Sequence, residues 1–365
     1  MTQNKYNLWL ANIDSISFSR VKTLLTFFDN AESVYRATEN MLKSTKLDFV
    51  DKIIETKEPD YYLEILEKKN IQFTSILNED YPSQLKDIYN PPVGLYMAGR
   101  LSFSDLEKNN VAIVGSRQCS DYGIATTVSI AKYLASKNIQ IISGMATGID
   151  TYAHKGVLEA NGITIAVLGC GVDVCYPKNN FALYEKIKQT GAIISEYASG
   201  IEPRPFHFPM RNRIISGLSV ATVVVEAGLK SGSLITADCA LEQGKDIFAV
   251  PGNINSKLSS GTNNLIKQGA YLLTDPEEIL EILNIGNVQQ VDIAQIIEET
   301  QNNQLDLTPE EKIIFDCVGK IPIEIDEIHR QTILNIQNLN YNLTILELKG
   351  ILMRLPGNKY VRSKS

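Results

Sequence analysis

The feature that most constrains the fold of this chain is a unit that repeats between residues 111 and 252. In each copy a short run of Val, Ile, Leu and Ala leads into a turn rich in Gly or Ser, and helical patterns separate the copies. The runs lie at residues 111–114, 139–142, 163–168, 192–194, 220–225 and 246–250. Near-continuous apolar strands that alternate with helices indicate a parallel sheet covered by helices on both faces. We therefore expect an α/β domain built on a mostly parallel, Rossmann-like sheet.

The turns that follow these strands carry the residues suited to binding an anion. In parallel sheets of this kind, ligands bind outside the carboxyl ends of the strands. Glycine lets the backbone approach a ligand, serine hydroxyls and helix N-termini donate hydrogen bonds, and arginine adds a permanent forked charge. We expect these turns to bind phosphates, and the candidate residues are Gly115, Ser116, Arg117, Ser143, Gly144, Gly169, Lys178, Ser231 and Ser233.

Each turn also has a purely structural interpretation. Gly115-Ser116-Arg117 is compatible with a tight turn bearing a solvated arginine, and Lys178 with simple solvation. Ser231 suits the N-cap of a helix, and Asp150 suits a helix N-terminus as well as a ligand. The dinucleotide pattern G-x-G-x-x-G is absent from the first turn, and the next strand ends in Ser143 without a ribose-binding acid. NAD is therefore disfavoured, and we expect no cofactor.

Residues 203–213 interleave basic and aromatic side chains in a proline-rich loop that runs into a helix. Single-stranded nucleic acid is bound in this manner, because cations follow the phosphates and aromatic faces stack on bases. The alternative is that the two Phe side chains fill the core while Arg211 or Arg213 pairs with an acid such as Glu226. The candidates for DNA binding in this segment are Arg204, Phe206, Phe208, Arg211, Asn212 and Arg213.

The sequence offers no convincing catalytic or metal-binding group. His154 falls in an expected helix, His207 lies beside prolines, and His329 lies in the C-terminal part. The five cysteines show no C-x-x-C spacing, which disfavours a zinc site and fits reduced thiols. We predict a protein that is not an enzyme and binds no metal.

Helical patterns and composition divide the chain into three folded parts. Apolar residues at three- and four-residue steps predict a helical N-terminal domain over residues 1–70, with Trp9 in its core. The sheet-containing domain covers residues 71–284, and a polar linker covers residues 285–308. Residues 309–365 have a winged-helix outline, with a helix near 310–318, another around 344–352 bearing Glu347, Lys349 and Arg354, and a strand near 358–361.

The net charge of −7 is unevenly distributed. Residues 111–275 carry 14 basic and 12 acidic side chains, whereas residues 276–365 carry 8 and 14. A domain that binds duplex DNA is normally basic. We therefore expect the acidic C-terminal part to contact protein, or to mask the groove that the phosphate-binding turns of the central domain form. No run approaches the ~20 apolar residues of a membrane span, and the first residues do not suggest secretion, so we expect a cytoplasmic protein.

The ordered motifs resemble those of the DNA processing protein A (DprA/Smf) family. They run from Val114-Gly115-Ser116-Arg117 through Ser143-Gly144-Met145-Ala146 and Tyr176-Pro177 to Arg211-Asn212-Arg213 and Ser231-Gly232-Ser233. The resemblance covers residues 71–275. It implies a bacterial protein that binds incoming single-stranded DNA during natural transformation, protects it, helps to load the RecA recombinase, and forms a homodimer through the Rossmann-like domain.

The resemblance also implies which side chains line the DNA groove. They are Arg117, Lys178, Arg204, Arg211 and Arg213, with Phe206 or Phe208 as the residue that stacks on a base. The N-terminal part resembles a helix-hairpin-helix (SAM-like) domain, although Ile13-Asp14-Ser15-Ile16 lacks the glycines with which such hairpins approach a phosphate.

The competing interpretation is a nucleotide-cleaving, phosphoribohydrolase-like Rossmann enzyme. Such enzymes use a Pro-Gly-Gly-x-Gly-Thr turn followed by a glutamate. This chain has Ala227-Gly228-Leu229-Lys230-Ser231-Gly232-Ser233 in the analogous place, and its glutamate, Glu226, comes before the turn. A nucleotide-sensing domain without catalysis is a third possibility.

Overall fold

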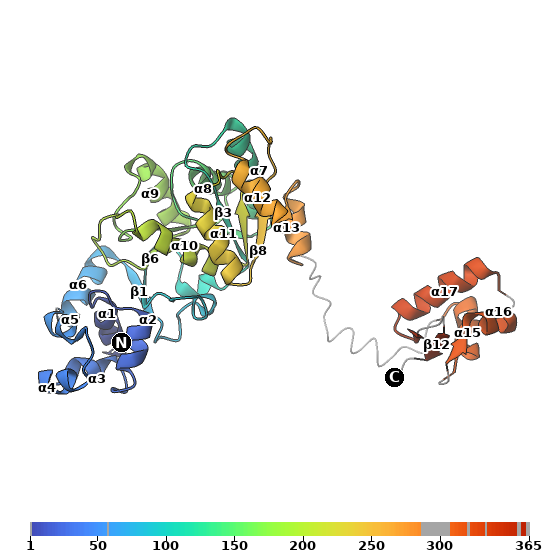
Figure 1. Ribbon diagram of the computed structural model, residues 1–365, viewed down its shortest axis with the longest axis horizontal. Coiled ribbons are helices and arrows are strands. Elements are labelled where there is room, and N and C mark those ends of the chain that lie inside the picture. The colour runs from blue at the N-terminus through green and yellow to red at the C-terminus, as the bar shows by residue number, and fades with distance from the viewer. Residues whose placement is uncertain are drawn as a thin grey trace. The chain divides into compact units, whose positions relative to one another are not determined.

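The computed structural model describes residues 2–56, 58–285, 307–319, 322–332, 334–355 and 359–362. The chain forms two compact units, residues 1–287 and 288–365 (Figure 1). Each unit has its own buried apolar core. The N-terminal helices belong to the same unit as the sheet. Most of the expected linker lies outside the described residues, which omit 286–306.

The first unit is built on a nine-stranded sheet with the order β1-β2-β6-β5-β4-β3-β7-β8-β9. The strands from β3 to β9 pair in parallel, whereas β2 is antiparallel to both of its neighbours. The mostly parallel sheet predicted from the apolar runs is thus confirmed. The strands are β1 (Gln72–Ser75), β2 (Gly94–Gly99), β3 (Asn110–Val114), β4 (Gln140–Ser143), β5 (Thr164–Val167), β6 (Ala192–Ser195), β7 (Ala221–Val224), β8 (Asp246–Ala249) and β9 (Tyr271–Leu272).

Helices cover both faces of this sheet, because alternate side chains of each strand point to opposite faces. Val111 and Ile113 of β3 pack with one set of helices, whereas Ala112 and Val114 pack with the other. The first set includes α7 (Asp121–Ser136), α8 (Ile149–Glu159) and α13 (Glu277–Ile282). The second set comprises α10 (His207–Gly217), α11 (Gly232–Glu242) and α12 (Ser260–Lys267). α9 (Phe181–Thr190) packs near β5 and β6.

The strand order reverses between β3 and β7. From β3 the chain moves outward through β4 and β5 to β6, and then returns to place β7 on the other side of β3, with Val111 opposite Ala221. The turns after β3 and β7 therefore diverge at the carboxyl edge of the sheet. Such a switch point is where open α/β sheets form a ligand-binding crevice.

Six short helices precede the sheet, as the helical pattern of residues 1–70 predicts. Trp9 is 2% exposed, so its place in the core is confirmed. Asn12 donates a hydrogen bond to the hydroxyl of Tyr96 on β2 (2.8 Å), which joins the helices to the second strand of the sheet. The helices are α1 (Thr2–Ala11), α2 (Phe18–Leu24), α3 (Ala31–Arg36), α4 (Glu39–Ser44), α5 (Val50–Glu55) and α6 (Pro59–Lys69).

The second unit has the predicted winged-helix outline of three helices and a small antiparallel sheet. Thr308 and Glu311 form a capping box that starts its first helix. No helix in the described ranges of either unit is long and apolar enough to cross a membrane. The elements are α15 (Pro309–Cys317), β10 (Ile323–Glu324), α16 (Ile325–Thr332), α17 (Ile336–Leu348), β11 (Leu352–Leu355) and β12 (Lys359–Arg362).

The bounds predicted for the helix around residues 344–352 are wrong, because the corresponding helix, α17, lies at Ile336–Leu348. It begins at Ile336, where the Asn335 side chain caps the backbone N–H of Asn338, and it ends at Leu348. Asparagine is a poor helix former in isolation, and the expected helix began only after the asparagines at the start of α17. Arg354 consequently lies on β11 and not on the helix.

Candidate nucleic-acid interface

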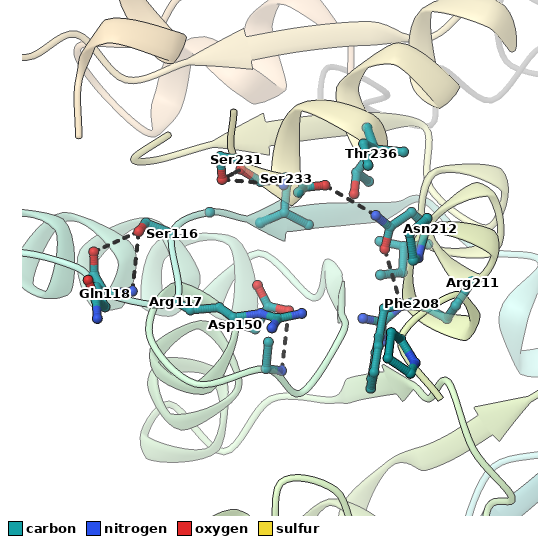
Figure 2. A pocket seen from close by; sticks show the side chains of 18 residues that line it. Ser116, Arg117, Gln118, Asp150, Phe208, Arg211, Asn212, Ser231, Ser233 and Thr236 are labelled. Carbon is teal, nitrogen blue, oxygen red and sulfur yellow. Dashed lines mark hydrogen bonds between the residues drawn. The ribbon is translucent and has the colours of Figure 1, made fainter. Parts of the chain in front are cut away.

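A cavity of about 590 Å³ opens where the strand order reverses. Its walls come from the turn after β3, the turn after β4, helix α10 and the start of α11. Figure 2 shows side chains from these four segments facing one space. The predicted site residues that line this cavity are Gly115, Ser116, Arg117, Phe208, Arg211, Asn212, Ser231 and Ser233.

The turn after β3 is fixed by its glycine and presents its arginine to solvent. A Cβ on Gly115 would lie 2.6 Å from the side chain of Ile149, so only glycine fits. The Ser116 hydroxyl donates to the carbonyl of Gln118 (2.6 Å), which closes the turn locally. Arg117 is exposed, and its guanidinium carbon lies 5.6 Å from the ring centre of Phe208. Among the described residues Arg117 forms no ion pair within 4 Å, although its charge acts on the buried carboxylate of Asp150 in the same cavity, so its guanidinium is available to a ligand.

The turn after β4 uses its polar groups internally. The buried Ser143 hydroxyl donates to the carbonyl of Ile113 (2.6 Å). The backbone N–H groups of Gly144 and Ala146 donate to the carboxylate of Asp150 (3.1 and 3.4 Å). Burial raises the pKa of Asp150 above its usual value, while the nearby charge of Arg211 and these N–H groups act in the opposite direction. These N–H groups therefore serve Asp150 rather than an external phosphate.

Arg211 is a buried cation that holds two strand ends together. It is 5% exposed and donates to the carbonyls of Gly144 (2.7 Å) and Val167. A Cβ on Gly144 would lie 2.5 Å from its guanidinium, which explains the glycine there. Burial lowers the pKa of Arg211 to about 10. Its Nη1 donates to these backbone carbonyls and its Nε to the Asn212 side chain (3.3 Å), so Arg211 is tied into the fold although it lines both cavities.

Arg213 is also used within the fold. It makes a two-pronged ion pair with Glu196 (3.0 and 2.6 Å) and donates from Nε to the carbonyl of Asn90 (3.0 Å). The two side chains are 9% and 17% exposed. The sequence suggested Glu226 as the acid, but the partner is Glu196, which directly follows β6. The ion pair joins α10 to the end of β6, and the hydrogen bond to Asn90 joins α10 to the segment before β2.

Three aromatic rings lie near the cavity: Phe206 and Tyr176 are exposed, and Phe208 is half-buried. Phe206 is 60% exposed and meets the ring of His207 edge-on (4.5 Å between centroids). Phe208 is more enclosed and lies between Arg117 and Tyr176, whose ring is 5.3 Å away. Tyr176 is 41% exposed and was missed as a site residue. Its position two residues before Lys178, in the same turn, was the signal that would have found it.

A smaller cavity of about 90 Å³ adjoins the first and shares Arg117, Phe208 and Arg211 with it. Gly144, Gly169 and Tyr176 also line this space. A Cβ on Gly169 would lie 3.1 Å from the ring of Phe208, so glycine allows the ring its close approach.

Lys178, Arg204 and Phe206 lie outside the walls of both cavities. Lys178 starts the short helix η3 (Lys178–Asn180), and Arg204 lies in the loop before α10. Both cations are exposed, and neither forms an ion pair within the described part of the chain. They follow β5 and β6, so they lie on the same edge of the sheet as Arg117.

The start of α11 contributes a helix N-terminus to the large cavity. The Ser231 hydroxyl caps the N–H of Ser233 (3.4 Å) and contacts the Ser233 hydroxyl (2.8 Å). Asn212 donates to the carbonyl of Gly232 (3.2 Å), which ties α10 to this turn. Backbone N–H groups and the helix dipole favour an anion at such a position.

Glu226, the acid of the enzyme alternative, has a structural role. It is 3% exposed and accepts hydrogen bonds from the backbone N–H (2.9 Å) and hydroxyl of Ser120, the N-cap of α7. The buried His154 contacts Thr164 (2.7 Å), and burial lowers its pKa to about 3. No group of three or more His, Cys, Asp or Glu side chains in the described ranges could hold a metal ion.

Two family models match the chain. The model of DNA recombination-mediator protein A matches residues 72–284, which contain all nine strands of the large sheet. The model of the DprA winged helix domain matches residues 298–358. The match to the first model covers more than half of the chain.

Curated relatives and solved structures agree with these matches. Protein Smf of Synechocystis sp. is 34% identical over 99% of this chain and 100% of its own length. DNA processing protein DprA of Streptococcus pneumoniae is 46% identical over 56% of this chain and 72% of its own. The X-ray structure of the Streptococcus pneumoniae protein covers 76% of this chain and 95% of that chain, at a TM-score of 0.63 and 35% identity. A structure of DNA processing protein A from Helicobacter pylori, which addresses its single-stranded DNA binding mode, covers 58% of this chain and 95% of that chain, at a TM-score of 0.53 and 32% identity.

Proposed function

Because the chain belongs to the DNA recombination-mediator protein A (DprA/Smf) family, we propose that it binds single-stranded DNA at the carboxyl edge of its large sheet. The binding mode described for the Helicobacter pylori relative supports this ligand. The protein is a DNA-processing protein, and its role is to protect incoming single strands in the cytoplasm and to help load RecA during natural transformation. The family resemblance supports RecA and a second copy of the chain as partners.

The observation that carries the proposal is the environment of Arg117. Its charge lies at the rim of a cavity of about 590 Å³, over an aromatic ring, and it forms no ion pair within 4 Å in the described residues. An exposed arginine on a half-buried aromatic ring suits a phosphate whose neighbouring bases are unstacked. A regular duplex keeps its bases stacked, so it does not offer them to this cavity.

We assign the candidate residues to two roles. Contacts to DNA come from exposed groups: the cations bind phosphates, Phe206 and Tyr176 stack on bases, and the start of α11 donates N–H groups. Positioning comes from Ser143, Arg211 and Arg213, whose donors are used within the fold. The proposed phosphate-binding cations are Arg117, Lys178 and Arg204.

We infer that the protein acts by binding and not by cleaving nucleotides. Glu226 is buried and holds the N-terminus of α7, so it is not free to act as a nucleophile or base. Incubation with nucleoside monophosphates is expected to release no free base. Release that disappears in Glu226→Gln, with the variant shown to be folded, would support a phosphoribohydrolase instead.

The test of DNA binding is a salt series with labelled oligo-dT and with duplex DNA of equal length. Single strands lose affinity with a log–log slope of about −0.7 per neutralised phosphate. Three phosphate contacts therefore predict a slope of roughly −2 for oligo-dT. A slope near zero, or equal affinity for the duplex, would contradict the proposal.

A further inference from the structure

Asp173 lies at a junction of three segments that are far apart in the sequence. Its carboxylate accepts hydrogen bonds from Lys69 Nζ (2.5 Å), Ser199 Oγ (2.9 Å) and the backbone N–H of Gly200 (2.9 Å). Lys69 is the last residue of α6, and it also donates to Ser199 Oγ (2.9 Å). One carboxylate therefore joins the N-terminal helices to the turn after β5 and to the loop after β6.

The turn that contains Asp173 is packed tightly against the loop after β6. The N–H of Gly171 donates to the carbonyl of Ile201 (2.8 Å). A Cβ on Gly171 would lie 2.7 Å from the carbonyl oxygen of Ala198 and 2.8 Å from Asp173 Oδ1. The backbone can approach this closely only because residue 171 is glycine. The position of the turn thus depends on the contacts around Asp173.

The same turn continues into two proposed DNA contacts. Tyr176 follows Asp173 by three residues and packs on Phe208, which lies under Arg117. Lys178 follows two residues later and is exposed. Neither Asp173 nor Lys69 lines the large cavity. These two residues can therefore affect DNA in that cavity by their charge or through the position of the turn.

Resting on the proposed DNA-binding function, we propose that the Lys69–Asp173 pair is a brace by which the N-terminal helices hold the turn of residues 169–178 in its DNA-binding position. Asp173 is a positioning residue in this scheme. The N-terminal helices contribute to binding without contacting DNA themselves. This gives that region a task that fits its lack of phosphate-approaching glycines.

The hydrogen bonds keep Asp173 ionised at neutral pH. Burial alone raises the pKa of its carboxyl, but the donors Lys69, Gly200 and Ser199 outweigh burial and leave the pKa below its usual value. A negative charge close to a DNA site weakens DNA binding by simple repulsion. Removal of that charge therefore separates two hypotheses. If Asp173 acts only by its charge, DNA binding becomes tighter; if the carboxylate positions the turn, DNA binding becomes weaker.

The decisive experiment measures oligo-dT affinity of full-length Asp173→Asn and Lys69→Met. Loss of a hydrogen-bonded junction is expected to weaken binding about three- to tenfold in each variant. Because both substitutions break one contact, their effects are not expected to add. The affinity of the double variant for oligo-dT is expected to lie within about twofold of that of the weaker single variant. Asp60→Asn is the matched control, since Asp60 of α6 pairs with Lys5 of α1 (3.1 Å) and, among the described residues, forms no ion pair or hydrogen bond with the turn. Unchanged or tighter binding by Asp173→Asn would overturn the brace.

Limited trypsin digestion gives a second measurement that does not depend on DNA. Lys178 is an exposed cleavage site, and loosening of the turn is expected to speed cleavage after it in Asp173→Asn and Lys69→Met but not in Asp60→Asn. Equal cleavage rates in the unmodified protein and in all three variants would reject the brace even if DNA binding were confirmed. If the unmodified protein bound no DNA, the proposed function would be rejected, and faster cleavage in Asp173→Asn and Lys69→Met would still show that the pair holds the turn in place.

Discussion

The N-terminal helices and the carboxyl edge of the sheet use their cations differently. Residues 1–70 carry 10 basic and 11 acidic side chains, and residues 111–275 carry 14 and 12, so neither region is strongly charged. Five cations of this region form ion pairs with acids of the same N-terminal region: Lys5, Arg20, Arg36, Lys43 and Lys52. At the edge of the sheet, Arg117, Lys178 and Arg204 have no such partner in the described chain. We therefore propose that the exposed cations gathered at this edge, and not the net charge, mark the DNA-binding surface.

Some cations near the carboxyl edge of the sheet are buried and paired. Replacing one of them is expected to give the largest effect, a loss of stability. Arg213→Ala leaves Glu196 enclosed without its partner, which is expected to lower the free energy of unfolding by about 3 kcal/mol. Urea unfolding of the two-domain chain, followed by a probe in the first unit, measures this loss. Arg20→Ala removes an exposed pair with Asp48 and is expected to cost less than about 1 kcal/mol. Similar losses of unfolding free energy in both variants would contradict the distinction between cations buried in the fold and cations in exposed ion pairs.

The next effect concerns the free arginine. Arg117→Ala is expected to weaken oligo-dT binding by about 1–3 kcal/mol, because a charge-assisted contact to phosphate is lost. Arg36 is the control, since it pairs with Glu32 on an N-terminal helix (2.7 Å). Arg36→Ala is expected to bind like the unmodified protein. Equal affinity of the two variants in one buffer would refute the assignment of Arg117.

A matched pair of phenylalanines tests the stacking role. Phe206 and Phe27 are 60% and 55% exposed, but only Phe206 lies at the carboxyl edge of the sheet. Phe206→Ala is expected to weaken oligo-dT binding by about 1–2 kcal/mol through the loss of one stacked base. Phe27→Ala is expected to change the affinity by less than twofold. Fluorescence anisotropy with both variants measures the difference, and a similar loss in each would contradict specific stacking.

The smallest effect is expected when the second unit is removed. A chain ending at Asn284 keeps every strand of the large sheet and both covering layers of helices. It is expected to bind oligo-dT as tightly as the full chain, or more tightly if the acidic residues of the linker repel DNA. A loss greater than about tenfold (1.4 kcal/mol), in a truncated protein shown to be folded, would make the winged helix a DNA-binding surface.

The sequence was sufficient to predict the sheet but not the roles of individual arginines. Apolar runs report which segments are buried on both sides, and the parallel strands follow from that pattern. Arg211 and Arg213 lie in the same basic stretch as Arg204, yet they point into the fold, toward Gly144 and Glu196. Their partners are separated from them by 67 and 17 residues, so spacing alone does not reveal them.

The errors in the second unit have a related cause. The start of α17 is rich in asparagine, and its stability comes from Leu339 and Leu343 in the core and not from local propensity. The acidity assigned to the C-terminal part also needs refinement. Residues 276–306 carry seven acidic and no basic side chains, whereas residues 307–365 carry seven acidic and eight basic ones. The winged helix is thus close to neutral.

The reversal of strand order between β3 and β7 also has a consequence for folding. The two strands are neighbours in the sheet, but Val111 and its partner Ala221 are 110 residues apart in the chain. A growing chain that has completed β3 to β6 still lacks α11, one wall of the cavity. Long-range pairings of this kind close late. The cavity therefore exists only in the completed sheet, and any ligand that binds it stabilises both halves of the domain together.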